Sequence, residues 1–370
     1  LSFMGKKWDY DVPSVELWKE VFRVLKEGGH LLAFAGTRTQ HRMAVNIEDA
    51  GFEIRDMIAW VYGSGFPKSH NIGKAVDKLQ GNEREKTISI DINHLERGDK
   101  NINKQNYTRD VGVFNFENEQ REKRNNLTTK GNSKWEGWGT ALKPALEPIT
   151  MARKPFKTSV AENVLKNGVG GINIDGCRVG TEVITNNVND FSNQHGNKFG
   201  NGKPIKKLGE SKVVGRFPAN FIHDGSDEVT DLLEESSRFF YCAKASKQDR
   251  NEGLDEFEDK FRAGLSGADR NTDKKLDDVS ERFRTQPAKN NHPTVKPTDL
   301  MRYLVRLVTP KNEIVLDCFM GSGSTGKACA LEGLSFVGID LDKDYCKIAK
   351  ARIDKALEDK RIMDSQTKLF

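Results

Sequence analysis

Residues 321–327, GSGSTGK, form a glycine-rich loop after the apolar run IVLD, and loops of this kind hold nucleotides in many proteins. The glycines have the G-x-G-x-x-G spacing of a dinucleotide-binding loop, and with Lys327 they give most of a Walker A phosphate loop. A Walker A loop needs a Ser or Thr after the lysine to bind Mg²⁺, but this chain has Ala328 there. The sequence therefore disfavours a Walker A site.

Two aspartates flank the loop and help to choose between the remaining ligands. Asp340 ends the next predicted strand, where a carboxylate can accept hydrogen bonds from ribose hydroxyls. Asp317, just before the loop, would repel a pyrophosphate but can face the cationic amino group of a methionine moiety. A Rossmann dehydrogenase also places such a unit first, whereas here it comes last. The pattern favours S-adenosylmethionine over a dinucleotide, and a loop that only turns the chain is the third alternative.

The elements around the loop follow from hydrophobic spacing. A helix is expected before it, because four residues share one helical face: Leu300, Tyr303, Leu304 and Leu307. A strand at 313–318, a short helix ending at Gly333 and a strand at 335–340 then give a βαβ unit, which a final amphipathic helix follows. This unit would place both aspartates at the same edge of a sheet.

The N-terminal part predicts the rest of an α/β fold. A helix is expected from Ser14 to Gly28, with Trp18, Val21, Phe22 and Leu25 on one face. The unbroken apolar run at 30–36 is typical of a central parallel strand covered on both faces. A helix at 38–50, with Met43, Ile47 and Ala50 on one face, and a strand at 52–62 follow. The alternation indicates the α/β class.

Polar stretches interrupt this pattern at 81–134 and 185–212, where we expect long loops or disordered insertions. A third stretch, 247–290, alternates acidic and basic residues and is interpreted as a charged linker. The expected organisation has five parts: a target-side half at 1–80, a recognition region with insertions at 81–215, a return to the catalytic domain at 216–246, the linker at 247–290, and a cofactor-binding half at 291–370.

Composition narrows the class of protein further. The net charge is +5 and the pI is about 8.7, which is compatible with a polyanionic partner without requiring one. The five cysteines never form a C-x-x-C pair, so the sequence suggests neither a zinc site nor a disulfide framework, and no metal is expected. There is no apolar run of membrane-spanning length and no signal-peptide pattern, so a cytoplasmic location is expected.

DCFMGSGSTG, together with the upstream HPTVKP, resembles the cofactor-binding half of the amino-group DNA methyltransferases, the N6-adenine and N4-cytosine enzymes. The order is that of the permuted β-class, with target-side motifs first and cofactor motifs last. The first half, from SFMGKKW to GFPKS, is similar to such enzymes from phages and prophages, as are GWGTALKPALEPI, GRFPANFIHDGS and YCAKASKQDRNEG. The resemblance implies a Rossmann-like S-adenosylmethionine-dependent methyltransferase sheet in permuted order.

The resemblance also implies a set of cofactor-binding residues. The loop would lie against the methionine moiety, Asp317 would approach it, Asp340 would hold the ribose, and the HPTVKP segment would close the pocket from the other side. The implied set is Asp317, Phe319, Gly321, Ser322, Gly323, Asp340, His292, Thr294, Lys296 and Pro297.

One family motif is missing from residues 1–370. The catalytic motif of this group is an acidic, serine or asparagine residue followed by Pro-Pro and an aromatic, and the sequence contains no Pro-Pro pair. In relatives the motif immediately precedes a segment like LSFMGKKW, so we expect it before Leu1 and assign no catalytic residue in this chain. A natural inactive form, a relic that binds DNA or S-adenosylmethionine, is the alternative to a fragment.

The implied function is site-specific DNA methylation of the kind found in restriction–modification systems. A methyl group would pass from S-adenosylmethionine to the N6 amine of adenine or the N4 amine of cytosine in a flipped-out base of double-stranded DNA. DNA contacts are expected from residues 64–215, where Trp135 and Trp138 either stack against DNA or pack within a core or hairpin. The sequence does not distinguish adenine from cytosine, the recognition site or the oligomeric state.

Overall fold

The computed structural model describes residues 11–63, 65, 69–89, 126–190, 206–233, 240–260 and 288–367. Two compact units divide the chain: Leu1–Ser64 with Ala145–Phe370, and Gly65–Pro144. Among the described residues, no helix is both long and apolar enough to cross a membrane.

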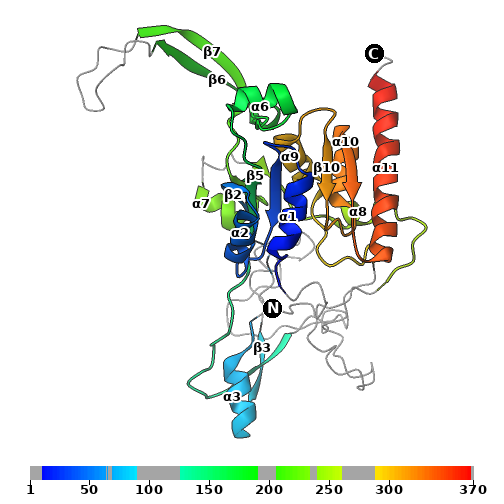
Figure 1. Ribbon diagram of the computed structural model, residues 1–370. Coiled ribbons are helices and arrows are strands. Elements are labelled where there is room, and N and C mark those ends of the chain that lie inside the picture. Colours follow the sequence, from blue (N-terminus) through cyan, green and yellow to red (C-terminus); the bar gives the residue numbers. More distant parts are fainter. Residues whose placement is uncertain are drawn as a thin grey trace, which may run out of the picture. The chain divides into compact units, whose positions relative to one another are not determined.

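The first unit contains a five-stranded sheet in the order β1-β5-β2-β8-β9. Two of its strands, β2 and β5, are labelled in Figure 1. Its strands are β1 (His30–Phe34), β2 (Glu53–Val61), β5 (Leu146–Arg153), β8 (Phe221–His223) and β9 (Phe240–Tyr241). β5 runs antiparallel to both β1 and β2, whereas β2, β8 and β9 are parallel to one another. The register pairs Val61 with Leu146 at the point where the second unit leaves the sheet.

Strand β1 has the two-sided cover that its apolar run predicted. Leu31 and Ala33 pack with the helices α1 (Val15–Val24) and α2 (Gln40–Asp49), whereas Leu32 and Phe34 pack on the opposite core. The predicted parallel pairing was wrong, because within the described residues β1 pairs with the antiparallel β5. A short apolar run specifies burial but not the direction of the partner strand.

The helices form where the sequence placed them. Trp18, Met43, Ile47 and Ala50 are buried on the faces predicted for α1 and α2. The leading helix of the C-terminal part, α9 (Thr298–Val308), likewise buries the four residues predicted for its inner face. Each helix is therefore fixed by an apolar stripe that recurs at helical spacing.

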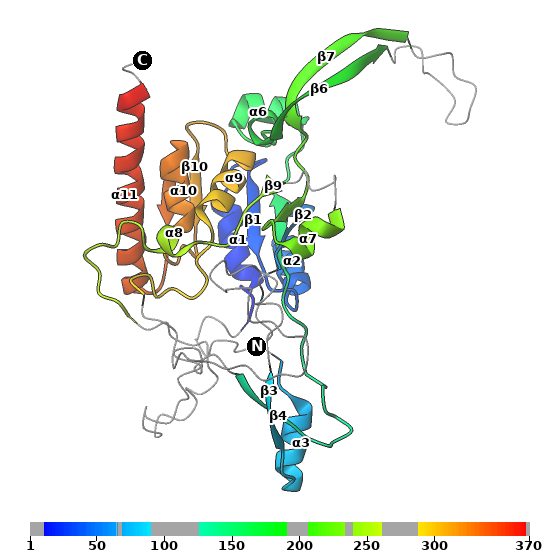
Figure 2. The ribbon, with the colours of Figure 1, turned by 180° about the vertical axis from the view of Figure 1, so that it is seen from behind.

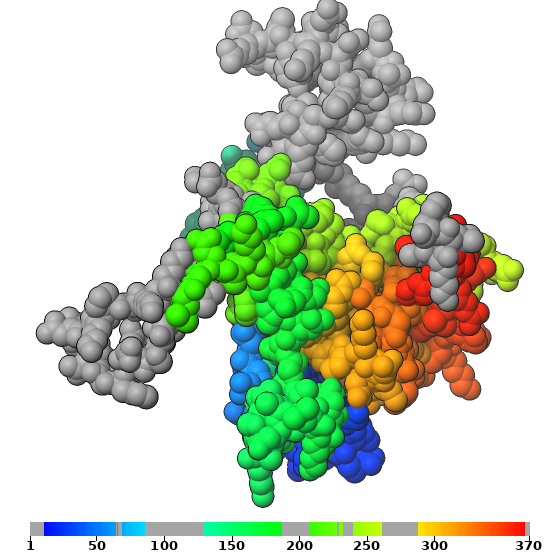
Figure 3. Space-filling model, turned by 90° about the horizontal axis from the view of Figure 1, so that it is seen from above, coloured from blue at the N-terminus to red at the C-terminus, as the bar shows by residue number. Residues whose placement is uncertain are grey.

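The predicted βαβ unit is present at the end of the chain. The parallel strands β10 (Ile314–Asp317) and β11 (Ser335–Gly338) flank α10 (Ser324–Glu332), and α11 (Lys343–Thr367) follows. α11 runs beside α10 in both ribbon views (Figure 2). The orange and red atoms of these elements form one continuous body in Figure 3. The α/β class is confirmed.

Three polar stretches differ from expectation in their described parts. Residues expected as loops form two antiparallel pairs: β3 (Glu85–Ser89) with β4 (Asn126–Lys130), and β6 (Val179–Asp190) with β7 (Lys206–Arg216). The expected linker begins with α8 (Lys247–Asn251), and Leu254 after it is fully buried against α11. Residues 90–125, 191–205 and 261–287 of these stretches lie outside the described part of the chain.

The second unit, taken by itself, packs α3 (Ile72–Gln80) near the β3–β4 pair. Asp77 of α3 is almost fully buried and pairs with Arg84, whose guanidinium also donates to Glu136 at 2.9 Å. Two further hydrogen bonds from Arg84 reach Thr129 of β4. This network ties the helix to the strand pair.

Candidate functional site

The glycine loop after β10 has a backbone that only glycine adopts without strain at two positions. Gly321 and Gly323 have φ angles of 52° and 78°. A Cβ on Gly323 would lie 2.8 Å from the Cα of Ala349 in α11, so this position also permits close packing. The third glycine, Gly326, packs against Phe336 and Ile353 in the same way. The loop therefore combines an unusual turn with tight support from behind.

Asp317, at the end of β10, accepts hydrogen bonds from both sides of the glycine loop. One carboxylate oxygen accepts from the Oγ1 of Thr325 at 2.5 Å, and the other accepts from the backbone N–H of Phe319 at 3.0 Å. Burial raises the pKa of Asp317 above its usual range, and the nearby charge of Asp340 adds to this shift, whereas the hydrogen bonds from Thr325 and Phe319 oppose it. The side chain thus links the end of β10 to the first turn of α10.

Asp340 joins the glycine loop to the end of the next strand. Its Oδ2 accepts from the N–H of Gly321, and its Oδ1 accepts from the N–H of Asp342, both at 2.8 Å. A carboxylate has about four acceptor positions, so two remain for a ligand. The strand ends of β10 and β11 therefore present one carboxylate that is already oriented by the loop.

His292 forms the opposite wall of the site. Its Nε2 lies 2.6 Å from the position that a Cβ on Gly321 would occupy, and its ring is 4.5 Å from that of Tyr345. Its Nδ1 accepts from the N–H of Thr294 at 3.3 Å. Burial lowers the pKa of His292 to about 4, even though Asp340 opposes this. The imidazole is therefore neutral at pH 7.

Lys296 and Pro297 lie between the His292 segment and α9. The ammonium group of Lys296 pairs with Glu147 of β5 and lies 4.7 Å from the ring centre of Phe34. Its carbonyl, however, accepts from the Oγ of Ser324 at 2.9 Å. Pro297 is buried at the start of α9. This end of the HPTVKP segment contacts the site through its backbone.

Phe319 and Ser322 differ in exposure. Phe319 is 54% exposed, and its ring makes an edge contact with Trp18 at 6.4 Å. Ser322 is buried, and its carbonyl accepts from Nη1 of Arg352 at 2.6 Å. One residue is thus open to a ligand, whereas the other anchors the loop.

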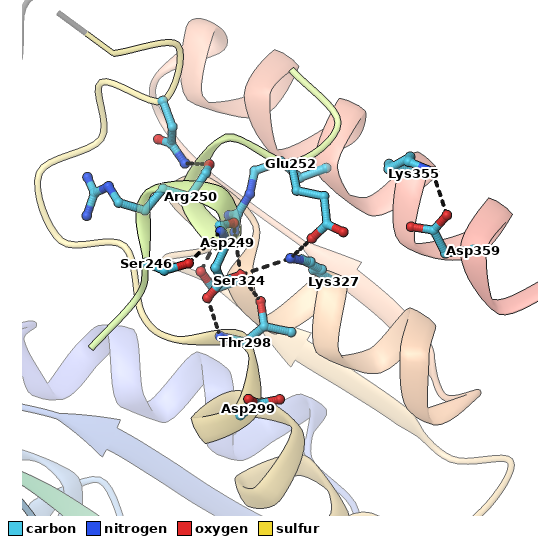
Figure 4. Close-up of polar contacts among 12 residues, drawn as sticks. Ser246, Asp249, Arg250, Glu252, Thr298, Asp299, Ser324, Lys327, Lys355 and Asp359 are labelled. Atoms are coloured by element: carbon cyan, nitrogen blue, oxygen red, sulfur yellow. Dashed lines mark hydrogen bonds and ion pairs between the residues drawn. The ribbon is translucent and has the colours of Figure 1, made fainter. Parts of the chain in front are cut away.

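Lys327 cannot serve a phosphate loop in this arrangement. It is almost fully buried and pairs with Asp249 and Glu252 on the far side of α10 (Figure 4). The sequence reasoning missed this cluster and the fully buried Arg352. One signal was available: Arg352 lies on the apolar face of the final helix, in line with Tyr345 and Ile348.

Metal and thiol chemistry find no support in the described residues. No group of three or more His, Cys, Asp or Glu side chains in the described ranges could hold a metal ion. Cys318, beside the loop, has a pKa raised to about 11, chiefly by burial and also by Asp317. Its thiol is therefore protonated at pH 7 and is a poor nucleophile.

The second unit carries an exposed aromatic pair. The rings of Trp135 and Trp138 meet edge to face at 5.2 Å, and the side chains are 37% and 60% exposed. The ammonium group of Lys134 lies 5.4 Å from the Trp135 ring centre. These tryptophans pack on each other at a surface and do not fill a core.

Comparison with known proteins finds relatives along most of the chain. A family model described as DNA methylase, for N6 and N4 methyltransferases, matches residues 6–351. The type II methyltransferase M.HindIII of Haemophilus influenzae is 24% identical over 343 residues, which cover 92% of this chain and 68% of that protein. M2.LlaDCHI, a type II methyltransferase of Lactococcus lactis subsp. cremoris, is 44% identical over 64 residues, 17% of this chain and 24% of that protein.

Among solved structures, the M1.HpyAVI–SAM complex is 16% identical with a TM-score of 0.37, covering 92% of this chain and 81% of that one. PvuII DNA methyltransferase, which is cytosine-N4-specific, is 11% identical with a TM-score of 0.36, covering 91% and 70%. This chain thus spans about two thirds of M.HindIII and about a quarter of M2.LlaDCHI in the matched segments. The family match runs from before α1 into α11 and includes all four sheets of the described residues.

Proposed function

Because this chain belongs to the DNA methylase family of N6-adenine and N4-cytosine enzymes, we propose that it transfers a methyl group from S-adenosylmethionine to an exocyclic amine in DNA. The observation that carries this proposal is the meeting of the glycine loop, Asp340 and His292 beside the strand ends of β10 and β11. Ligands of open α/β sheets bind at the carboxyl ends of the strands.

The residues present fit S-adenosylmethionine better than a phosphate-bearing nucleotide. Two carboxylates, Asp317 and Asp340, flank the loop, while Lys327 is turned away and neutralised. Such a site suits a cationic amino group and a ribose but would repel a pyrophosphate. The cofactor supplies a methyl group activated by a sulfonium.

Each wall has a proposed task. Gly321 and Gly323 would let the backbone approach the methionine part, Asp317 would face its amino group, and Asp340 would accept from the ribose hydroxyls with its free acceptor positions. The neutral His292 would close the pocket without adding charge near the sulfonium. The other proposed contacts are Phe319 and Thr294 through exposed groups, and Ser322, Lys296 and Pro297 through the backbone.

The target amine needs more than a methyl donor. Its lone pair is delocalised into the base ring, and extruding the base from a duplex costs about a few kcal/mol. The chain has no Pro-Pro motif, and we propose no residue of 1–370 as the group that holds the amine. What this chain supplies is position: a fixed cofactor pocket toward which the base is brought.

We propose that double-stranded DNA is contacted by residues 64–215, and that the protein works in the cytoplasm. Trp135 and Trp138 present exposed aromatic faces next to Lys134, which suits stacking and phosphate contact. The β6–β7 pair forms a long two-stranded ribbon that extends away from the sheet of its unit (Figure 1). A ribbon of this kind fits the major groove of DNA.

Calorimetric titration with S-adenosylmethionine and, separately, with NAD tests the cofactor site. We expect S-adenosylmethionine to bind and the Asp340→Ala variant to bind it at least about tenfold more weakly, since a charge-assisted hydrogen bond is lost. Asp342→Ala is the matched control, because Asp342 caps α11 through the N–H groups of Asp344 and Tyr345 and does not contact the loop. Tight NAD binding without an S-adenosylmethionine signal would refute the proposal.

Transfer is measured separately, with tritiated S-adenosylmethionine and mixed-sequence duplex DNA. Incorporation of tritium into the DNA would support the proposed methyl transfer. Cofactor and DNA binding without transfer by residues 1–370 would favour the binding-only alternative, which the missing Pro-Pro motif keeps open.

A further inference from the structure

Helix α8 touches more of the cofactor-binding half than its five residues suggest. Its N-terminus is capped by the Oγ of Ser246, which accepts from the N–H of Asp249 at 3.0 Å. The carboxylate of Asp249 accepts from the N–H of Thr298 and from Nζ of Lys327, both at 2.9 Å, and from the Oγ1 of Thr298 (Figure 4). One carboxylate thus joins α8 to the start of α9 and to the middle of α10.

The ionised form of Asp249 is favoured in this setting. Burial alone would raise its pKa, but the hydrogen bonds from Thr298 and Lys327 together lower it below the usual range. The cluster also balances its charge, because Asp249 and Glu252 face Lys327 and Arg352. Buried ion clusters contribute little net stability compared with apolar packing, so their geometry is the more informative property.

Arg352 carries the connection from α8 to the glycine loop. Its guanidinium is fully buried, with Nη2 donating to the carbonyl of Asp249 at 3.0 Å and Nη1 donating to the carbonyl of Ser322 at 2.6 Å. The same Nη1 lies 3.3 Å from the Oγ of Ser322. A change in the position of α8 is therefore transmitted to the loop by one rigid, planar group.

Arg250 and Asn290 carry a second connection, from α8 to the opposite wall. Nη2 of Arg250 donates to the carbonyl of His292 at 2.7 Å. Asn290 is fully buried, donates to the carbonyl of Arg250 at 2.9 Å, and accepts from the N–H of His292 at 3.1 Å. Both walls of the candidate site, the loop and His292, are therefore held by neighbouring residues of one helix.

We propose that α8 is a positioning element that sets the separation of the two walls of the cofactor site, with Asp249 and Arg250 as its positioning residues. The proposal rests on the proposed S-adenosylmethionine site. Neither residue contacts the ligand: Asp249 acts through Arg352 on the loop, and Arg250 acts on His292.

The first test measures affinity for S-adenosylmethionine by calorimetry in the full chain. Asp249→Asn keeps the size of the side chain and removes its charge, and we expect about tenfold weaker binding. Arg250→Lys keeps a charge but loses the planar donor pair, and we expect about threefold weaker binding. The matched control is Glu332→Gln, because Glu332 joins α10 to α9 through Arg302 and Arg306 at the other end of these helices.

A merely structural role would make the three variants alike, with a lowered melting temperature and unchanged affinity at temperatures where all are folded. Equal affinities for Asp249→Asn, Glu332→Gln and the unchanged chain would overturn the proposal while leaving the cofactor site standing.

A second readout does not depend on the ligand. Hydrogen exchange of the free protein should be faster in Asp249→Asn at residues 318–324 and 290–296 together, and unchanged there in Glu332→Gln. Faster exchange with no S-adenosylmethionine binding in the unchanged chain would refute the proposed function alone. Unchanged exchange at both walls in Asp249→Asn would refute the positioning role.

Discussion

Arginine–carboxylate networks cross-link two regions of this molecule, and the networks differ in what they join. In the unit Gly65–Pro144, Arg84 contacts Asp77 and Glu136, which are 7 and 52 positions away. In the proposed cofactor-binding half, Arg352 contacts Asp249 and Ser322, which are 103 and 30 positions away. The first network closes a small module on itself, whereas the second holds the glycine loop of the proposed site against elements that meet only in the complete fold. A binding site assembled from separate segments needs support of the second kind.

Replacing Arg84 should separate the two regions most clearly. Arg84→Met leaves the buried Asp77 and the neighbouring Glu136 without their cation. We expect amide exchange in α3 to accelerate on the order of a thousandfold, because an unpaired buried charge opens the module. Affinity for S-adenosylmethionine should stay within about twofold, and DNA affinity should fall if the tryptophan pair contacts DNA. Equal loss of both affinities would break the distinction between the regions.

Acid should act on the cofactor-binding half through His292. The pKa of His292 is about 4 in the folded protein, below the ordinary value of 6.5 that applies to the unfolded chain. As the pH falls, the unfolded chain therefore takes up this proton at a higher pH than the folded protein does. Stability should therefore fall as pH drops from about 6.5 to 4, by about 3 kcal/mol for this group. Urea denaturation at stepped pH measures this.

The His292→Gln variant isolates the contribution of His292. Its stability profile should be flatter over that range, although His30, whose pKa burial also lowers to about 4, keeps part of the slope. A profile that is identical with and without His292 would contradict the assignment. S-adenosylmethionine affinity should show no step between pH 6 and 8, since the imidazole is neutral throughout.

A methyl group on a loop glycine gives the smallest of the three effects. Gly323→Ala meets the Cα of Ala349 at 2.8 Å and keeps a φ of 78°, which together should cost about 2 kcal/mol of folding stability. Binding of S-adenosylmethionine should weaken by at least about tenfold. Gly81→Ala in the other unit and Gly333→Ala after α10 are matched controls, with φ values of 71° and 72° and no atom within 4 Å. If either control weakens cofactor binding as much as Gly323→Ala does, the close packing of Gly323 on Ala349 is not the cause of the effect.

Local pattern predicted much of the fold because local pattern produces it. Trp18 in α1, Met43 and Ile47 in α2 and the apolar stripe of α9 each fix their own helix, and the C-terminal βαβ unit follows from its own residues. The β6–β7 pair was missed, since its strands are rich in Asn and Lys and largely exposed, and their stability comes from pairing across 15 intervening residues. Strands that pair in this way lack the alternation of apolar and polar residues from which a strand is predicted.

The candidate site divides in the same way. Asp317, the loop glycines and Asp340 lie within 24 positions of one another, and the βαβ geometry brings them together. His292 was placed by resemblance. The sequence around Asp249 and around Arg352 does not indicate that the two residues are in contact. Their contact spans 103 positions and forms only after the helices have packed. The side chain of Lys296 turned toward Glu147 for a similar reason: its partner lies in a strand 149 positions earlier.

The register of β2 and β5 has one more consequence. Val61 and Leu146 are paired across the two strands, and the N–H of Tyr62 donates to the carbonyl of Ala145 at 2.9 Å. The whole unit Gly65–Pro144 therefore departs and returns through two adjacent points on one hydrogen-bonded ladder. The entropic cost of bringing the two ends of the inserted segment together rises only slowly as that segment lengthens. The sheet can thus accept inserts of different length and sequence at this position, so that one module can be exchanged for another while the register of β2 and β5 stays the same.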